Sequence, residues 1–438
     1  FLDGLTSSGD IADFIVRPLH EARQDEREET LFTRAERGLV WCASMKKASS
    51  TDEAAELLVN GFCVILFPKS GKALGCEVKT GEKRSPSAPE AENTVKGAKD
   101  AFTETLRTNT SLIRRHLRTP ELRLEESVVG RRSLTKVTVC WVEGLTDPEL
   151  PARMKKRLGE IDIDGLLSPA AVEEYVTGSR KTAFPLLEFT ERTDHFCQGL
   201  LDGQVGLLVD GLPIGYLAPV SFGRLMRSPE DRATDYLSAS MLRSLRYLAL
   251  GVSLLLPGIY AAMAMFHQQM LPTKLLLSII ESKQDLPFST LVEVVGLLCA
   301  FELLQQAGLH LPQAIGTAVS IIGGLVVGTA AVDAKLVSPA ALIVTASSGI
   351  CGFTLPNREL SDALRLWRLG LTVLGGVLGL FGVTAGLLLL LIKLESLGRS
   401  YLAPFGEAEV KGALVRERLA EQKWRDGMLR PIDERNQR

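Results

Sequence analysis

The chain has 438 residues, a formal net charge of −2 and 46% hydrophobic residues. A nearly neutral charge argues against general nucleic-acid binding, which depends on a strongly basic surface. The composition averages two unlike halves, because residues before Ser244 are polar and mixed in charge whereas residues 244–405 contain long uncharged runs. Since the chain begins with Phe1 rather than methionine, we expect further residues to precede it.

Short apolar runs alternate with charged stretches near the N-terminus. Residues 11–18 and 39–43 have the composition of strands, and residues 62–67 (FCVILF) are typical of a buried strand. Residues 77–99 are polar and rich in Pro, Ser and Glu, which indicates a linker. We therefore predict a first small subdomain with its linker over residues 1–95.

An amphipathic helix is predicted over residues 100–117. Its apolar face carries Phe102, Leu106, Ile113 and Leu117 at helical spacing. A second face carries a row of arginines, Arg107, Arg114 and Arg118, which we call the arginine row. We interpret this row as an assembly face between subunits; the alternatives are a solvated face or a grip on phosphates or lipid headgroups.

Strand and helix patterns alternate from Glu121 onward, and they predict an α/β subdomain over residues 96–243. Residues 137–142 alternate as a strand, and Asp147-Pro148 supplies an N-cap and a first-turn proline for a helix. Asp210-Gly211 lies between two apolar runs and predicts a type I′ hairpin turn. Ser228-Pro229 is expected to begin a helix that continues directly into the first hydrophobic segment.

Hydrophobic segments of the length of a membrane span follow. They are Tyr247–Phe266, Thr290–Leu309, Ala314–Ala331, Leu336–Phe353 and Leu369–Ile392. The fold class that we expect is an α/β soluble N-terminal region followed by an all-α polytopic membrane bundle. The bundle would occupy residues 244–396, and a charged tail would occupy residues 397–438.

Basic residues give a conflicting prediction of membrane topology. Arginines before the first span favour a cytoplasmic N-terminal region: Arg224, Arg227, Arg232, Arg243 and Arg246. Further basic residues lie just before the last span and in the tail after it: Arg358, Arg365, Arg368, Lys411, Arg416, Arg418 and Lys423. If the last segment crosses the membrane once, these two groups cannot both be cytoplasmic.

Two glutamates interrupt the second hydrophobic segment. Glu293 and Glu302 are nine residues apart, so at about 100° per residue they point to opposite sides of a helix. A carboxylate within the membrane is a functional candidate by default. The alternative is an interfacial or re-entrant helix whose glutamates are hydrated.

Small residues recur at four-residue spacing in the third segment, and we call them the small-residue stripe. Its members are Gly316, Ser320, Gly324 and Gly328, with Thr317 beside them. Such a stripe permits close helix packing, or it can line a narrow aqueous path. Glycines in the last segment are interpreted as packing sites only: Gly375, Gly379, Gly382 and Gly386.

Enzymatic chemistry finds little support in the sequence. The seven cysteines are scattered and form no CxxC pair, which favours a reduced, cytoplasm-facing region without a disulfide framework. A nucleophile–base pair, a metal-ligand cluster and a phosphate-binding loop are all missing. We therefore predict a protein that is not an enzyme and that has no cofactor, metal or nucleic-acid site.

Several motifs together resemble the A subunits of GerA-type spore germinant receptors of endospore-forming bacteria. They are FTETLRTNTSLIRRHLRTPELRLEE (102–126), GRRSLTKV (130–137), RLGEIDIDGLL (157–167), LRYLALGVSLLLPGIY (245–260), FHQQMLPTKLLLSI (266–279), LPQAIGTAVSIIGGLVVGTAAVDAKLVSP (311–339), LPNRELSDALRLWR (355–368) and YLAPFGE (401–407). The resemblance covers about residues 57–407. The stretch 97–100 departs from it, reading Gly-Ala-Lys-Asp where the family has Gly-Pro-Arg-Glu.

This resemblance implies a membrane subunit of the inner spore membrane that works with a polytopic B subunit and a lipoprotein C subunit. It also implies that nutrients trigger the complex and that the A subunit oligomerises and forms or gates an ion path. A related sporulation protein, the AF product of the stage V A operon, has the same architecture. The alternatives are an accessory channel protein of that kind, or a secondary transporter using Glu293 and Glu302, although no inverted repeat is evident.

Overall fold

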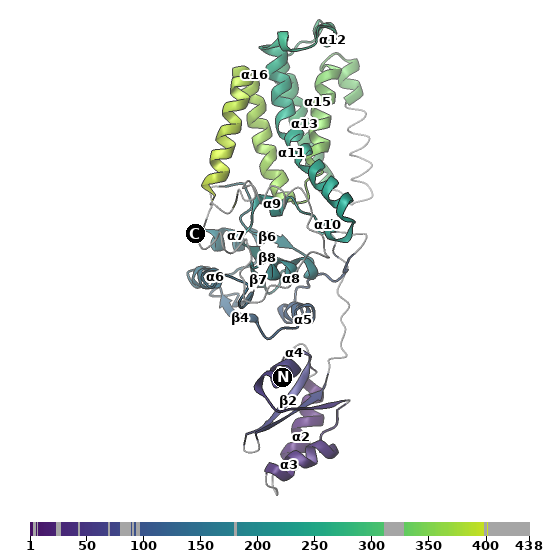
Figure 1. The fold of residues 1–438 in the computed structure, drawn as a ribbon. Helices are drawn as coiled ribbons and strands as arrows, with labels where there is room; N and C mark the ends of the chain where they lie inside the picture. Colours follow the sequence, from purple (N-terminus) through teal and green to yellow (C-terminus); the bar gives the residue numbers. More distant parts are fainter. Residues whose placement is uncertain are drawn as a thin grey trace. The chain divides into compact units, whose positions relative to one another are not determined.

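The computed structural model describes the chain except residues 3–5, 7, 23–27, 43, 69–70, 79–88, 90–91, 93–96, 179–181, 311–327, 398–400 and 402–438. The described residues form two compact units. One contains residues 1–180 and 186–219, and the other contains residues 181–185 and those beyond 219. Sheets and helices build the first unit, whereas helices build the second (Figure 1). The predicted fold class, an α/β region followed by an all-α region, is confirmed.

A three-stranded antiparallel sheet forms the N-terminal part of the first unit, with β3 in the middle. Its strands are β1 (Met45–Ala48), β2 (Phe62–Phe67) and β3 (Lys72–Glu77). The helical segments are α1 (Ser8–Ile11), η1 (Ala12–Val16), α2 (Arg17–Ala22), α3 (Glu28–Arg34), η2 (Ala35–Leu39) and α4 (Thr51–Val59). Strand β2 confirms the strand predicted over residues 62–67.

Residues 11–18 are helical, so the strand predicted there is wrong. Ile11 and Ile15 are buried, with 4% and 2% of their surfaces exposed, and they lie four residues apart on one helical face. The strand predicted over residues 39–43 is also wrong, because η2 ends at Leu39 and β1 begins only at Met45. Apolar runs this short fit a helix and a strand equally well.

A five-stranded antiparallel sheet forms the rest of the first unit, in the order β4-β5-β7-β8-β6. The strands are β4 (Leu122–Val129), β5 (Thr135–Val142), β6 (Glu188–Thr190), β7 (Val205–Val209) and β8 (Gly215–Ala218). The helices are α5 (Leu106–His116), α6 (Glu149–Gly159), α7 (Pro169–Thr177) and α8 (Thr193–Leu201). Strand β5 and helix α6 confirm the elements predicted at those positions.

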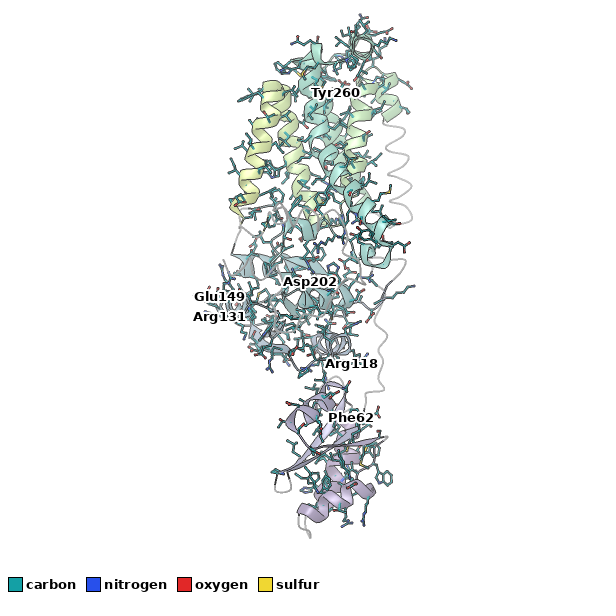
Figure 2. The ribbon with its side chains drawn as sticks, viewed as in Figure 1. Phe62, Arg118, Arg131, Glu149, Asp202 and Tyr260 are labelled. Carbon is teal, nitrogen blue, oxygen red and sulfur yellow. The ribbon has the colours of Figure 1, made fainter. Side chains whose placement is uncertain are left out.

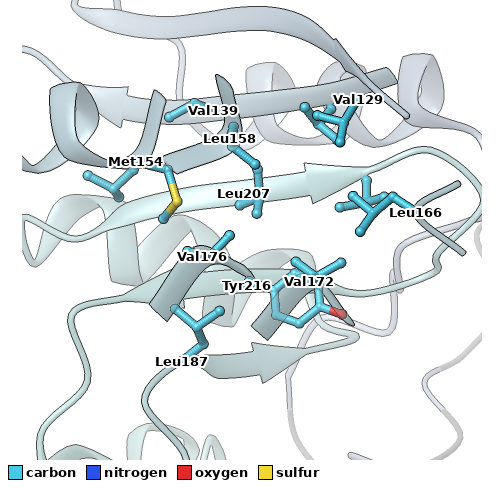
Figure 3. Packing of buried hydrophobic residues seen from close by; sticks show 13 residues of the cluster. Val129, Val139, Met154, Leu158, Leu166, Val172, Val176, Leu187, Leu207 and Tyr216 are labelled. Carbon is cyan, nitrogen blue, oxygen red and sulfur yellow. The ribbon is translucent and has the colours of Figure 1, made fainter. Parts of the chain in front are cut away.

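Both faces of this sheet are covered by helices, because side chains along a strand alternate between its faces. Val139 and Leu207 face the core that includes α6 and α7, where Met154, Leu158 and Val172 pack (Figure 3). Their neighbours point the other way, toward α5 and α8. That second core contains Cys140, Leu208, Leu106, Ile113, Phe196 and Leu200.

Asp210-Gly211 does not form the predicted two-residue type I′ turn. Strand β7 ends at Val209 and β8 begins at Gly215, and of the two turn residues only Gly211 has a positive φ, 85°. The Asp210 carboxylate accepts a hydrogen bond from the Leu106 backbone N–H at 3.0 Å. Asp210 therefore caps the first turn of α5.

Helix α5 begins at Leu106, six residues later than the sequence predicts. The preceding residues are extended: Ala101 forms a β-bridge with Arg192, and the Phe102 N–H donates to the Glu191 carbonyl at 2.8 Å. Phe102 is nevertheless buried, because its ring packs edge-on against Phe196 at a centroid distance of 5.3 Å. Burial of Phe102 therefore needs no helix at that position.

The second unit is a bundle of helices. They are α9 (Phe222–Leu225), α10 (Glu230–Ala233), α11 (Tyr236–Met265), η3 (Gln268–Met270), α12 (Thr273–Lys283), α13 (Thr290–His310), α15 (Pro339–Gly352) and α16 (Arg358–Ser396). Within the described ranges, three helices are long and apolar enough to cross a membrane: α11, α13 over Thr290–Ala307, and α16. The helix expected to continue from Ser228-Pro229 into the first span is interrupted, because Thr234 between α10 and α11 is extended (φ −104°, ψ 165°).

Helix α16 folds back on itself at Gly379, which has φ 67° and ψ −151°. A Cβ atom on Gly386 would lie 2.5 Å from the Leu371 side chain, and one on Gly375 would lie 3.0 Å from Val383. In a straight helix, Leu371 and Gly386 would be about 22 Å apart. The segment predicted as one span is therefore a helical hairpin whose halves run antiparallel (Figure 1).

Candidate functional site

The two predicted carboxylates lie on opposite faces of α13, as their spacing predicts, and they contact different neighbours. Glu293 lies in the first turn and is buried, with 3% of its surface exposed. Glu302 lies nine residues, or about two and a half turns, further along and has 33% of its side chain exposed. Each carboxylate belongs to a separate polar cluster, and both clusters are inside the helical unit.

Glu293 is the centre of the first cluster, which we call the Glu293 cluster: Tyr260, Lys283, Thr290, Glu293 and Ser338. The Glu293 carboxylate accepts a hydrogen bond from the backbone N–H of Ser338, the N-cap residue of α15. Helix N-termini favour negative charge, so the carboxylate stabilises the start of α15. This contact joins α13 to α15.

Lys283 completes the Glu293 cluster from the end of α12. Its Nζ lies 3.6 Å from the Glu293 carboxylate, donates to the Thr290 hydroxyl, and lies 5.5 Å from the centroid of the Tyr260 ring. Tyr260 lies near the end of the bundle that carries α12 (Figure 2). Burial lowers the pKa of Lys283, and the charge of Glu293 acts in the opposite direction. The cluster thus holds α11, α12, α13 and α15 together.

Glu302 is the centre of the second cluster, which we call the Glu302 cluster: Ser253, Glu302, Ser348, Arg365 and Arg368. Its carboxylate accepts from the Arg368 guanidinium at 2.7 Å and from Arg365 at 3.4 Å. Arg368 has only 5% of its side chain exposed and also donates to the Ser348 hydroxyl at 3.5 Å. The Ser348 hydroxyl in turn donates to the Ser253 carbonyl at 2.7 Å. These contacts join α11, α13, α15 and α16.

A cavity of about 10 Å³ lies beside the Glu302 cluster. Gln305, Ser361 and Arg368 are among its lining residues, and the side-chain oxygen of Gln305 is buried without a hydrogen-bond partner among the residues described. This volume is about the minimum for one water molecule. It is too small for a nutrient or a hydrated ion.

The cationic partners of Glu293 and Glu302 could not be predicted from the sequence. Lys283 lies in a polar connection, and Arg365 and Arg368 are interpreted above as topology signals before the last span. The available signal is that a buried carboxylate needs a partner of opposite charge. That rule requires a cationic partner but does not identify it. The partners of Glu302 follow it by more than 60 residues, so local sequence patterns do not indicate them.

Two of the arginines before the first span also have a carboxylate partner. Arg243 and Arg246 donate to one oxygen of Asp231 at 3.0 and 2.8 Å, and the Asp231 side chain is fully buried. Burial alone would raise the pKa of Asp231, but the two guanidiniums hold it below its ordinary value. These arginines therefore fix α10 against α11, in addition to any effect on topology.

Most of the small-residue stripe lies outside the described residues: Gly316, Thr317, Ser320 and Gly324. Gly328 is described, is helical, and is half-buried. A Cβ atom on it would lie 3.6 Å from the Leu342 side chain of α15. Gly328 thus faces a neighbouring helix.

Arg107 and Arg114 of the arginine row lie on α5, whose opposite face packs on the five-stranded sheet. Arg118 lies two residues beyond the end of α5 at His116, so the prediction that it shares the helical face is wrong. Arg107 and Arg118 are exposed and Arg114 is half-buried (Arg118 is labelled in Figure 2). Ser111, which lies between them, is buried and donates to the Arg107 carbonyl at 2.7 Å. Across the part of the chain that the structure describes, no group of three or more His, Cys, Asp or Glu side chains could hold a metal ion.

The sequence profile of a family described as "Bacillus/Clostridium GerA spore germination protein" matches residues 1–428. This chain belongs to the GerA family. The match includes both structural units and nearly the whole chain. Membership confirms the resemblance to spore germinant receptor subunits that the sequence motifs indicate.

Relatives of this GerA protein include the uncharacterized membrane protein YfkQ of Bacillus subtilis (strain 168), 35% identical over 95% of this chain and 82% of that protein. Spore germination protein KA of the same organism is 33% identical over 95% of this chain and 77% of the relative. Spore germination protein XA of Bacillus anthracis is 34% identical over 83% of this chain and 74% of the relative. Most of this GerA protein therefore aligns with membrane and spore germination proteins.

A solved structure is also similar to this GerA protein. It is the N-terminal domain of the A subunit of the Bacillus megaterium spore germinant receptor GerK3, which is 26% identical. The similarity covers 51% of this chain and 81% of that domain, with a TM-score of 0.38.

Proposed function

We propose that this protein is the A subunit of a nutrient germinant receptor, and that it triggers spore germination by oligomerising into, or gating, an ion channel. The observation that carries the proposal is the family match over residues 1–428, which includes the helical unit as well as the α/β unit. Relatives named as spore germination proteins support the process. Helices of spanning length support a membrane location.

We place the α/β unit in the cytoplasm and both ends of α16 on that same side of the membrane. A Cβ on Gly258 of α11 would lie 3.0 Å from the Leu371 carbonyl, and one on Gly379 would lie 2.7 Å from His267. The first half of α16 therefore runs parallel to α11, and the second half returns. Basic residues then gather at one end of the bundle, as the positive-inside rule favours: Arg243, Arg246, Arg358 and Lys393.

The contacts of Glu293 and Glu302 favour a channel subunit over a secondary transporter. A coupling carboxylate in a transporter has to exchange its proton or ion during the cycle. Both glutamates are held by cationic side chains, Lys283 for one and Arg368 for the other. We therefore assign both glutamates to helix packing. We also propose that the protein is not an enzyme.

A polytopic B subunit and a lipoprotein C subunit are the partners that we propose, together with further copies of this chain. We assign the arginine row to assembly, because α5 is already anchored to the sheet through its other face. Changing Arg107 and Arg118 together to Glu should reduce recovery of the complex by at least about tenfold, since repulsion across an interface costs several kcal/mol. Co-purification of the receptor subunits measures this.

Arg115 is the matched control for the arginine row. It is exposed and lies on α5, about 80° around the helix from Arg107 and about 100° from Arg114. Arg115→Glu should leave assembly unchanged. Normal assembly of the double variant with altered nutrient affinity would instead make the row a ligand site.

The small-residue stripe is our candidate for the conducting path. In a symmetric oligomer, a helix that faces the axis meets copies of itself, so large side chains there close the path. Thr317→Leu and Ser320→Leu should each abolish germination-linked ion release while the protein stays in the membrane. Ion release from spores and immunoblots of the membrane fraction measure the two quantities.

Val319→Leu is the control, because it places the same leucine side chain beside the stripe rather than in it, and it should leave ion release intact. If the stripe serves packing, the Thr317 and Ser320 variants will be unstable and lost from the membrane. If both variants assemble and release ions normally, the third segment does not line the path.

A further inference from the structure

Three cysteines from three separate segments meet in the core of the N-terminal sheet. Cys63 on β2 and Cys76 on β3 are direct partners in the antiparallel register, and both belong to one buried cluster. Cys42, between η2 and β1, packs against that cluster. Directly opposed residues in such a register have Cβ atoms about 4.5–5.5 Å apart. We call this group the thiol cluster.

Cys76 is the middle member of the thiol cluster. It is 0% exposed, lies directly opposite Cys63, and belongs to the buried cluster against which Cys42 packs. Burial raises the pKa of Cys76 and of Cys63, so both are protonated at neutral pH. Cys42 differs from them because it is only half-buried. A reagent in solution therefore reaches the cluster through Cys42.

We propose that Cys42 and Cys76 are a thiol pair that forms a disulfide by exchange with a low-molecular-weight disulfide. The Cys42 thiolate attacks one sulfur of the small disulfide, whose S–S bond breaks, and the leaving small thiolate takes up a proton. The Cys76 thiol then gives up its proton and attacks the Cys42 sulfur, releasing the second small thiol. Two protein thiols are oxidised to one disulfide while the small disulfide is reduced to two thiols.

This disulfide would join the segment after η2 to β3, the central strand of the sheet. The N-terminal helices and the sheet share the buried cluster that contains Ile15, Phe32 and Leu74. A covalent link between them restricts the unfolded chain and thereby raises thermal stability. The pair is thus a redox-sensitive connection between the two layers of the N-terminal part.

A second cysteine pair in the same chain serves as an internal control. Cys140 and Cys197 lie in one buried core, and the nearby Cys197 raises the pKa of Cys140 further than burial alone does. Both are buried, at 0% and 4% exposure, and the described residues place no half-exposed cysteine in that core. If access through Cys42 controls the reaction, the Cys140–Cys197 pair stays reduced under the same conditions.

The test uses the full chain in detergent micelles, incubated with oxidised glutathione, quenched with acid, alkylated and mapped by mass spectrometry of its peptides. We expect a Cys42–Cys76 linked peptide, at a yield at least about tenfold above any Cys140–Cys197 link. Cys42→Ser should remove it, and Cys63→Ser should retain it. Circular dichroism of each variant confirms that it is folded.

Two results would overturn the proposal. One is glutathione attached to Cys42 with Cys76 still free, which means that the second thiol is out of reach. The other is equal linkage of Cys140 and Cys197, which means that oxidation follows general unfolding. In either case the thiol cluster is a set of small apolar core residues. The test reads out bond formation alone, so it stands or fails separately from the channel proposal.

Discussion

Buried charges in the helical unit occur in opposite pairs at the three places described above. Glu302 meets Arg368, Glu293 meets Lys283, and Asp231 meets two arginines. Removing one partner of a buried pair typically costs about 3–5 kcal/mol, because the remaining charge is left uncompensated. Apolar faces pack against many partners, whereas a pair of this kind requires two particular helices to meet. At the residue scale, these pairs specify which helices are neighbours.

Only half of each pair was predictable. The sequence places Glu293 and Glu302 in a hydrophobic segment and on opposite helix faces, and the structure has them there. Their partners lie on other helices, and hydrophobic periodicity gives no information about which helices meet. The small-residue stripe remains a prediction, since most of it is outside the described residues.

Asp231 gives a prediction for pH dependence. Its folded pKa lies below the ordinary value of about 3.9, so its contribution to stability is present above that value and is lost as the pH falls through the folded pKa. The Tm of the purified full chain should therefore be insensitive to this group from pH 7 to about 5 and should fall below about pH 4. Asp231→Asn should lower Tm at pH 7 and should make the fall of Tm below about pH 4 less steep.

Asp235 is the control for Asp231. It is exposed and lies four residues away, at the start of α11. Asp235→Asn should leave unchanged both the Tm at pH 7 and the fall of Tm below about pH 4. If Asp231→Asn still shows the full fall of Tm at acid pH, other carboxylates cause the pH dependence.

At the scale of elements, α16 shows what a hydropathy pattern omits. Residues 369–392 are continuously apolar and were expected to cross once. Gly379 adopts φ 67° and ψ −151°, which other residues rarely do, so it makes the turn. Gly375, Gly382 and Gly386 do pack, as predicted. Gly382 and Gly386 pack the two halves of α16 against each other, whereas Gly375 lies closest to Gly258 of α11. Hydropathy records that a segment is apolar and does not record a reversal within it.

The hairpin also removes the topological conflict between the basic residues before and after the last segment. We predict that cysteines introduced at Arg358 and Ser396, which are exposed near the two ends of α16, are labelled from the same side of the membrane. A membrane-impermeant maleimide applied to oriented vesicles of a variant lacking the native cysteines measures this. Ser278→Cys, on α12 between two spans, is the marker for the opposite side.

Labelling of Arg358→Cys and Ser396→Cys from opposite sides would contradict the hairpin. Gly379→Ala offers a second check, because its Cβ would lie 2.7 Å from the His267 ring at a backbone conformation unfavourable for alanine. We expect Gly379→Ala to have a lower Tm than the unchanged protein. Gly370→Ala on the same helix has open space and should not.

At the scale of the whole molecule, the sequence predicts the division into an α/β region and a helical region. The apolar pattern of a chain folded in water differs from that of a chain folded in lipid. Alternating and helical apolar patterns indicate a water-soluble core before residue 220, and long uncharged runs indicate spans after it. Strand order was not predictable: β6 precedes β7 in the chain but pairs with β8 at the sheet edge. Such pairing depends on long-range contacts that local patterns do not encode.

The first unit should fold without the helical one. The cores on both faces of the five-stranded sheet, and the core of the three-stranded sheet, are built from residues before 220. A fragment of residues 1–219 should therefore be monodisperse and should melt cooperatively by circular dichroism.

A fragment of residues 1–204 is the matched control, because it lacks β7 and β8, which lie between β5 and β6. Without them β5 loses a neighbour and β6 loses its partner, so this fragment should show no cooperative transition. If residues 1–219 also melt without cooperativity while the full chain is folded, the first unit depends on the helical unit for its stability.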